Sequence, residues 1–170
     1  MNALLQVIAG PGPGRLATLA HPRADPWPAE QLAALARCGV DVLVSALTTA
    51  EQERLGFSGT ATAATQFGVD FVSFPATEGD VPRDEAVQVI ELAARLATHV
   101  RSGRFVATQS FGGVGRSTLL ACTTLVLLGI EPGEALRRVT DVAGKPITRD
   151  WLHDNATATP LRANPHPSPA

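Results

Sequence analysis

The stretch SFGGVGRSTLL, from Ser110 to Leu120, combines three glycines with an arginine and hydroxyl side chains. An apolar run precedes it and a longer one follows, so the pattern predicts a strand, a tight turn and a helix. N–H groups at a helix start carry the positive end of the helix dipole and favour an anion. The guanidinium of Arg116 can bind two phosphate oxygens, and Ser117 adds a hydroxyl. The stretch is thus typical of an anion site, although the glycines alone would also fit a plain turn.

The whole loop is assigned to this site. Its glycines let the backbone close around an anion, Arg116 supplies the fixed charge, and Phe111 is expected to pack on the helix rather than to stack on a ligand. The residues predicted to bind phosphate are Ser110, Phe111, Gly112, Gly113, Val114, Gly115 and Arg116.

The elements around the loop predict an α/β fold. Apolar runs at 4–9, 15–20, 40–47, 69–75 and 104–109 are typical of strands. Helices are expected over 28–38, 48–55, 60–67, 83–102, 116–128, 131–143 and 148–154. This alternation favours one domain with a central, mostly parallel sheet flanked by helices. The domain is expected to span 1–158, followed by a disordered, proline-rich tail at 159–170.

The composition restricts the function further. The 170 residues are 45% hydrophobic and carry a net charge of −2, which gives no general attraction to nucleic acid or to anionic membranes. Cys38 and Cys122 lie in apolar helical patterns and are interpreted as core residues of a cytoplasmic protein. The four histidines lack zinc-site spacing, so neither a metal nor a cofactor is implied. The apolar runs are too short for a signal peptide or a membrane span.

One alternative is a nucleotide-binding loop. The segment GGVGRST, 112–118, resembles the GGVGKST loop of the plasmid-partitioning ATPases, with arginine in place of lysine. In those proteins the loop follows the first strand of a longer domain and an aspartate after a later strand holds magnesium. No later apolar strand here ends in an aspartate, and arginine does not reproduce the compact charge of lysine.

A second resemblance covers most of the chain. The segment VATQSFGGVGRST is similar to the V-x-x-H-C-x-x-G-x-x-R-[ST] signature of the protein tyrosine and dual-specificity phosphatases, with Val106, Gly113, Arg116 and Ser117 in matching positions. The order of helices and strands from about residue 15 to 154 resembles small bacterial members of that superfamily. The resemblance implies their α/β fold, a phosphate-binding loop at 110–116 and phosphorylated ligands.

The resemblance also implies a catalytic cysteine, which this chain lacks. Ser110 stands at that position, and a serine hydroxyl is not ionised by the loop that makes a cysteine a thiolate. Gln109 replaces the preceding histidine and offers no base. The sequence contains no cysteine followed six positions later by arginine.

The segment FPATEGDVP, 74–82, resembles the acid loop of the same family, F-P-x-x-D-x-x-x-P. Glu78 takes the position of the aspartate, and Asp80 follows two residues later. Either carboxyl group is a candidate general acid, and both are equally consistent with a charged, solvated loop.

These observations favour a phosphatase-like protein that binds phosphate, or a phosphorylated protein or small molecule, and is catalytically impaired. A competing hypothesis is an active cysteine phosphatase in which the cysteine was replaced by serine to trap substrate. Gln109 and Glu78 argue against it, because one engineered site would not explain three departures. A nucleotide-binding loop and a scaffold whose loop stays empty are two further hypotheses. The sequence does not distinguish phosphotyrosine, phosphoserine, nucleotide and phosphoinositide ligands, nor does it give an oligomeric state.

Overall fold

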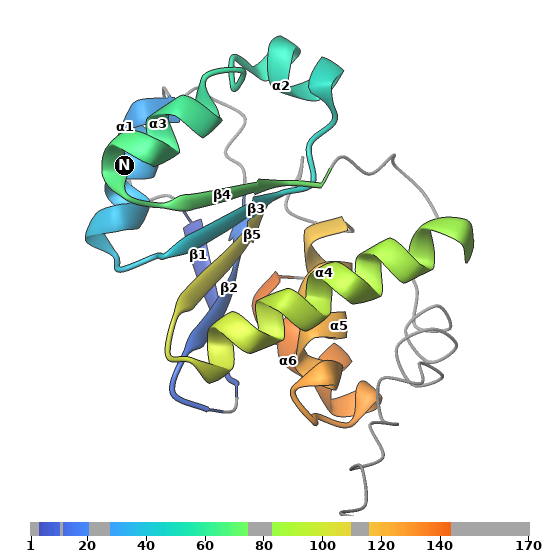
Figure 1. Cartoon of the computed structure of the whole chain (residues 1–170). Coiled ribbons are helices and arrows are strands. Elements are labelled where there is room, and N and C mark those ends of the chain that lie inside the picture. The colour runs from blue at the N-terminus through green and yellow to red at the C-terminus, as the bar shows by residue number, and fades with distance from the viewer. Residues whose placement is uncertain (1–3, 11, 21–27, 75–82, 110–115, 144–170) are drawn as a thin grey trace, which may run out of the picture.

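The computed structural model describes residues 4–10, 12–20, 28–74, 83–109 and 116–143 (Figure 1). They form a five-stranded sheet flanked by helices. The strands are β1 (Leu4–Ile8), β2 (Arg15–Ala20), β3 (Val42–Ser45), β4 (Asp70–Ser73) and β5 (Phe105–Gln109). The helices are α1 (Pro28–Arg37), α2 (Thr49–Leu55), α3 (Thr60–Phe67), α4 (Arg83–Arg101), α5 (Arg116–Leu127) and α6 (Pro132–Ala143).

The strand order is β1-β2-β5-β3-β4. β1 is antiparallel to β2, and the remaining neighbours are parallel, which confirms the mostly parallel sheet. The parallel strands end together, because Gln109 is in register with Leu19 on one side and with Ser45 on the other. We call this end of the sheet the carboxyl edge and the opposite end the amino edge. Ligands of open α/β sheets bind outside the carboxyl ends of the strands.

Helices cover both faces of the sheet. Figure 1 shows α4, α5 and α6 on one side of it and α1 and α3 on the other. One core lies between α4, α5, α6 and the sheet, and includes Leu96, Val106 and Leu120. A second core lies under α1 and α3, and includes Leu35 and Phe105. The central strand β5 thus contributes alternate residues to both cores, and all five of its residues are buried.

The predicted helices over 83–102 and 116–128 are confirmed. α4 buries the expected stripe, and α5 is buried at every position from Arg116 to Leu125, as its nearly uniform apolar character predicted. The α4 stripe consists of Val89, Ala93, Leu96 and Val100. The predicted helix over 148–154 and the tail at 159–170 lie outside the described residues.

The prediction that Cys38 is a core residue is wrong. Cys122 is fully buried on α5, but Cys38 is exposed. α1 buries Gln31, Leu32 and Leu35, and the next residue of that stripe would fall at 38 or 39. The helix ends at Arg37, and the N–H of Cys38 still donates to the carbonyl of Ala34 at 3.0 Å. Gly39 then turns the chain with a φ of 86°, so Cys38 lies at the exposed C-terminal end of α1 and not in the buried stripe.

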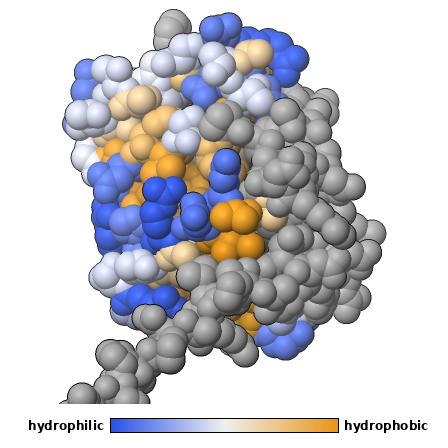
Figure 2. All heavy atoms as spheres, turned by 45° about the vertical axis from the view of Figure 1, so that its right-hand side comes forward, coloured by the Kyte–Doolittle hydropathy of each residue, from blue (hydrophilic) through white to orange (hydrophobic). Residues whose placement is uncertain are grey.

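The surface mixes polar and apolar residues. Figure 2 shows a face on which hydrophobic residues (orange) reach the surface between hydrophilic ones (blue), beside residues drawn in grey. Among the described residues, the large hydrophobic side chains that are exposed are Val7, Phe67 and Val87. No helix in the described part of the chain combines the length and apolar character needed to cross a membrane.

Candidate functional site

The segment predicted to bind an anion joins the central strand to the buried helix. β5 ends at Gln109 and α5 begins at Arg116, both at the carboxyl edge. The intervening residues 110–115 lie outside the described residues, as do Glu78 and Asp80 at 75–82. The structure therefore describes the two ends of the loop and the residues that hold them.

One residue directly after β3 holds both ends of the loop. The N–H of Ala46 donates to the carbonyl of Gln109 at 2.8 Å, and the carbonyl of Ala46 accepts from Nη1 of Arg116 at 2.9 Å. Ala46 is fully buried. The residue before the loop and the residue after it are thus fixed to the same point of the sheet.

A second bridge ties the strand directly to the helix. The hydroxyl of Thr108, one residue before the end of β5, donates to the carbonyl of Ser117 in the first turn of α5 at 3.0 Å. Thr108 and Ser117 are both fully buried. Because a buried hydroxyl is costly without a partner, this contact favours one fixed approach of α5 to β5. It places the N-terminus of α5 at the carboxyl edge.

Arg116 is held by a carboxylate from the neighbouring helix α2. Its Nη1 donates to Oε2 of Glu51 and its Nη2 to Oε1, each at 2.9 Å, so the ion pair is bidentate. The side chain of Arg116 is only 3% exposed, and that of Glu51 is 14% exposed. A planar guanidinium with two parallel hydrogen bonds is fixed in orientation as well as in charge.

Glu51 also begins α2. Its Oε2 accepts from the N–H of Thr48 at 2.7 Å, and its own N–H donates to the hydroxyl of Thr48 at 3.2 Å. This is a capping box, in which Thr48 is the N-cap of α2. The bond from Arg116 holds the pKa of the Glu51 carboxyl below its usual value, burial opposes this, and the Thr48 N–H adds to the lowering.

α2 depends on these polar contacts for its position. None of its residues is buried, so it has no apolar stripe that would pack it onto the sheet. The amide of Gln52 adds one further bond, from Nε2 to the carbonyl of Leu47 at 3.1 Å. The ion pair between Arg116 and Glu51 therefore connects the start of α5 to a helix that is otherwise solvent-facing.

Glu51 was missed in the sequence. The sequence predicted the helix around it but gave the glutamate no role in the site. The T-x-x-E spacing of Thr48 and Glu51 was the available signal, because it marks a capping box. A buried arginine also requires a counter-charge, but the pattern of residues near Arg116 does not show where that charge lies.

Gln109 is fully buried at the end of β5. Side chains alternate between the two faces of a strand, so the side chain of Gln109 lies on the same face as those of Phe105 and Ala107, which α1 and α3 cover. Its amide does not ionise near neutral pH and cannot act as a base. This agrees with the sequence interpretation of that position.

The described residues hold no group of three or more histidine, cysteine, aspartate or glutamate side chains placed to bind a metal ion. A hollow of about 380 Å³ lies elsewhere, between the end of β1 and α6. At the carboxyl edge the described residues thus provide a positioned guanidinium at the N-terminus of a buried helix.

Comparison with solved structures identifies this fold. The chain superimposes on kinase-associated phosphatase with its catalytic-site cysteine replaced by serine, with a TM-score of 0.77 and 21% identity over 91% of this chain and 96% of that one. The active form of the phosphatase Tk-PTP gives a TM-score of 0.73 and 23% identity over 94% and 100%. A cysteine-to-serine form of Pseudomonas aeruginosa TpbA bound to phosphotyrosine gives 0.51 and 21% over 94% and 90%.

The single α/β domain is thus the fold of the dual-specificity and tyrosine phosphatases, and the resemblance seen in the sequence is confirmed at the level of fold. No family model matches the chain, and no curated protein matches its sequence. Because these identities are below 25%, the comparisons establish the fold, and the function is inferred from the residues of this chain.

Proposed function

We propose that the loop from Ser110 to Arg116 binds phosphate or a phosphorylated ligand, and that the protein hydrolyses it poorly or not at all. The observation that carries the proposal is the position of Arg116. It is a buried guanidinium at the N-terminus of a buried helix, on the carboxyl edge of a phosphatase fold.

Both charge and geometry support a phosphate ligand. The guanidinium of Arg116 is fixed by Ala46 and Glu51, so little side-chain entropy is lost when it meets an anion. The helix dipole and the N–H groups of the first turn of α5 add positive potential at the same end. A phosphate monoester matches this arrangement, because its oxygens accept several hydrogen bonds from one side.

Glu51 limits the strength of the site. Its lowered pKa keeps it ionised at neutral pH, so it offsets the charge of Arg116. A bound phosphate dianion therefore needs the N–H groups of the loop and of α5 as well as the guanidinium. This makes the expected binding dependent on loop geometry, and not on a simple excess of positive charge.

This chain lacks the thiolate that would attack the phosphorus atom of a phosphate ester. A thiolate can form at neutral pH near a helix N-terminus, but a serine hydroxyl needs a base to accept its proton. Gln109, next to Ser110, cannot accept one. Glu78 and Asp80 are the candidate acids, and a shift of about 1 Å in such a group can cost about a hundredfold in rate.

The ligand class follows in part from the fold. A structural neighbour, TpbA, binds phosphotyrosine in a form whose cysteine is replaced by serine. This supports a site that retains a phosphorylated ligand without a thiol nucleophile. Phosphate itself and a phosphotyrosine peptide are accordingly the first ligands to test.

Calorimetric titration with phosphate and with a phosphotyrosine peptide tests the proposal. Arg116→Lys keeps the charge but loses the planar fork, and should weaken binding at least about tenfold, the equivalent of one charge-assisted hydrogen bond. Arg104→Lys is the matched control, because Arg104 is also ion-paired next to β5 but lies at the amino edge. Absence of binding to the unaltered protein, or equal binding to both variants, would contradict the proposal.

The same titration separates the competing functions. Binding of ATP with magnesium, but not of phosphate or the peptide, would favour a nucleotide loop. Absence of any binding would favour a scaffold. If the coding gene carries a cysteine codon at 110, the natural protein is an active cysteine phosphatase and the serine is a trap.

A further inference from the structure

Within the described residues, the outer edge of β1 has no strand paired to it. β1 lies at the end of the sheet, and among the described residues it pairs with β2 alone. Its sequence, LLQVI, contains neither a charged residue nor a proline, and its pairing with β2 runs without a bulge from Leu4 to Ile8. Charges, prolines and bulges are the usual devices that keep an exposed edge from pairing with another chain.

The other edge strand, β4, shows how this sheet protects an edge. β4 is shorter and begins with the exposed Asp70, whose carboxylate accepts from Nη2 of Arg104. Charge at an edge opposes pairing with a further strand. β1 instead presents Val7 with 45% of its surface exposed. The difference between the two edges indicates that the β1 edge is the one suited to contact.

The sequence of β1 is complementary to itself in one antiparallel register. If Gln6 faces Gln6 of a second copy, Leu5 faces Val7 of that copy, and Val7 faces its Leu5. Leu5 and Val7 share one face of the strand, so the register joins two partly exposed apolar side chains on each side of the axis. The Oε1 of Gln6 accepts from Thr18, and its amide can bond to the facing amide.

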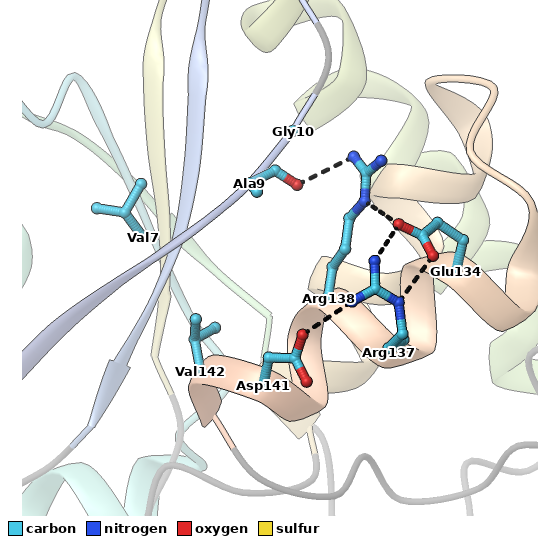
Figure 3. A pocket seen from close by; sticks show the side chains of 8 residues that line it. All are labelled: Val7, Ala9, Gly10, Glu134, Arg137, Arg138, Asp141 and Val142. Carbon is cyan, nitrogen blue, oxygen red and sulfur yellow. Dashed lines mark hydrogen bonds and ion pairs between the residues drawn. The ribbon is translucent and has the colours of Figure 1, made fainter.

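The charges beside the edge allow this approach. The hollow next to β1 has Val7 and Gly10 on one side and α6 on the other. Figure 3 shows the charged side chains of α6 on one side of β1 and Val7 on its other side. These charges are Glu134, Arg137, Arg138 and Asp141, which sum to zero.

The charged side chains of α6 can also exchange partners. Arg137 is bonded to Glu134 and Asp141, and its side chain is 61% exposed. In the antiparallel register the α6 helices of both copies lie on the same face of the joined sheet. Acidic and basic side chains from each copy then meet without a net like charge, which is electrostatic complementarity.

We propose that β1 pairs with β1 of a second copy of this chain, about a two-fold axis at Gln6. The two sheets then form one continuous sheet with no exposed β1 edge. Because the strands of the two copies run in opposite directions, their carboxyl edges lie at opposite ends of the joined sheet. Both Arg116 sites therefore stay accessible in the dimer.

Sedimentation equilibrium of the full chain tests whether two copies pair through β1. The unaltered protein should be dimeric, and Val7→Lys should be monomeric, because it places two charges in the paired strands. Val87→Lys is the matched control and should stay dimeric, since Val87 is exposed on α4, which packs against α5 and β5. A monomeric unaltered protein, or a Val7→Lys protein that is still a dimer, would overturn the proposal.

A cross-link tests the register. In a Cys38→Ser background, Gln6→Cys places two thiols opposite each other on the two-fold axis, at a Cβ separation near that of a disulfide. Mild oxidation should give a covalent dimer with Gln6→Cys and little with Val87→Cys. Equal cross-linking of the two variants, or none with Gln6→Cys, would refute the two-fold pairing at Gln6.

Discussion

Two arginine–carboxylate pairs flank the central strand of this protein, and they differ in burial and in the number of their hydrogen bonds. Arg104 precedes β5 at the amino edge, where its side chain is 33% exposed and that of its partner Asp70 is 64% exposed. Arg116 follows β5 at the carboxyl edge, where the corresponding values are 3% and 14%. The amino-edge pair has one bond between guanidinium and carboxylate, and the carboxyl-edge pair has two.

The contrast shows which pair has more than a surface role. An exposed ion pair contributes little, because water and salt screen it. Burying a pair is costly, and replacement by apolar residues is often neutral or stabilising. A buried arginine is therefore weak evidence for stability. Its position beside residues 110–115 fits the proposed function, in which the fixed guanidinium of Arg116 binds an anion.

The largest effect is expected from placing a thiol at position 110, which follows β5 at the carboxyl edge. Loss of a hydrolase nucleophile costs up to about a millionfold, and a misplaced acid about a hundredfold, so Ser110→Cys should raise aryl-phosphate hydrolysis by roughly four orders of magnitude. Steady-state hydrolysis of an aryl phosphate measures it. Ser102→Cys is the control thiol, because Ser102 is exposed between α4 and β5, at the amino edge.

If Ser110→Cys brings no gain while phosphate still binds, the acid at Glu78 or Asp80 no longer functions in catalysis. If neither binding nor hydrolysis is seen, the difference between the Arg116 and Arg104 pairs does not reflect phosphate binding at the carboxyl edge.

Removing each arginine should separate the two pairs by stability. Arg116→Ala leaves Glu51 without its buried partner and should lower the free energy of unfolding by about 3 kcal/mol. Arg104→Ala should lower it by less than about 1 kcal/mol. Urea unfolding of both variants gives the two values. Similar losses in both would mean that burial of Arg116 contributes nothing special.

The pH dependence of stability should reveal Glu51. Its pKa is lower in the folded protein than in the unfolded chain, so its contribution is complete above the unfolded value of about 4.5 and is lost as the pH falls through the folded value. Glu51→Gln should cost about 1–3 kcal/mol at pH 7 and progressively less below pH 4.5.

Urea unfolding at several pH values measures this difference. Glu134, whose pKa its bonds to Arg137 and Arg138 lower to about 2, also titrates in this range. It is present in both proteins, so subtracting the Glu51→Gln curve removes its contribution. A difference that does not change with pH would show that Glu51 acts only as a hydrogen-bond acceptor.

The smallest effect is expected at the start of α2. Thr48→Ala removes the hydroxyl that accepts from the Glu51 N–H and should cost about 1 kcal/mol. Thr65→Ala is a control, since Thr65 is an exposed helical threonine whose hydroxyl bonds only within α3. Thermal unfolding compares the two. A larger cost for Thr65 would mean that the capping box is not what holds Glu51 in place.

Much of this fold could be predicted from the sequence because its signals are local. The apolar run of β5, the glycines and the uniformly apolar α5 placed Arg116 at a strand-to-helix turn. The remaining strands and helices were predicted from their own apolar patterns, and their order resembles that of the phosphatase family. The exposure of Cys38 was mispredicted because α1 ends one residue earlier than its apolar pattern suggests.

The partner of Arg116 could not be predicted in the same way. Glu51 is 65 positions away, and only the register of β3 beside β5 brings it close. The strand order is likewise a property of the folded sheet, since it depends on which strand pairs with which. The carboxyl groups Glu78 and Asp80 stay predictions, because residues 75–82 lie outside the described residues.

Most substitutions of Ala46 would leave its hydrogen bonds to Gln109 and Arg116 intact. Both of its contacts to the loop ends use main-chain atoms, so any small side chain at 46 preserves the carbonyl contact, and only proline lacks the N–H. Because these hydrogen bonds do not depend on the side chain at 46, a comparison of sequences does not reveal them. Gln109 and Arg116 can therefore keep their positions beside β3 while the side chains around them change.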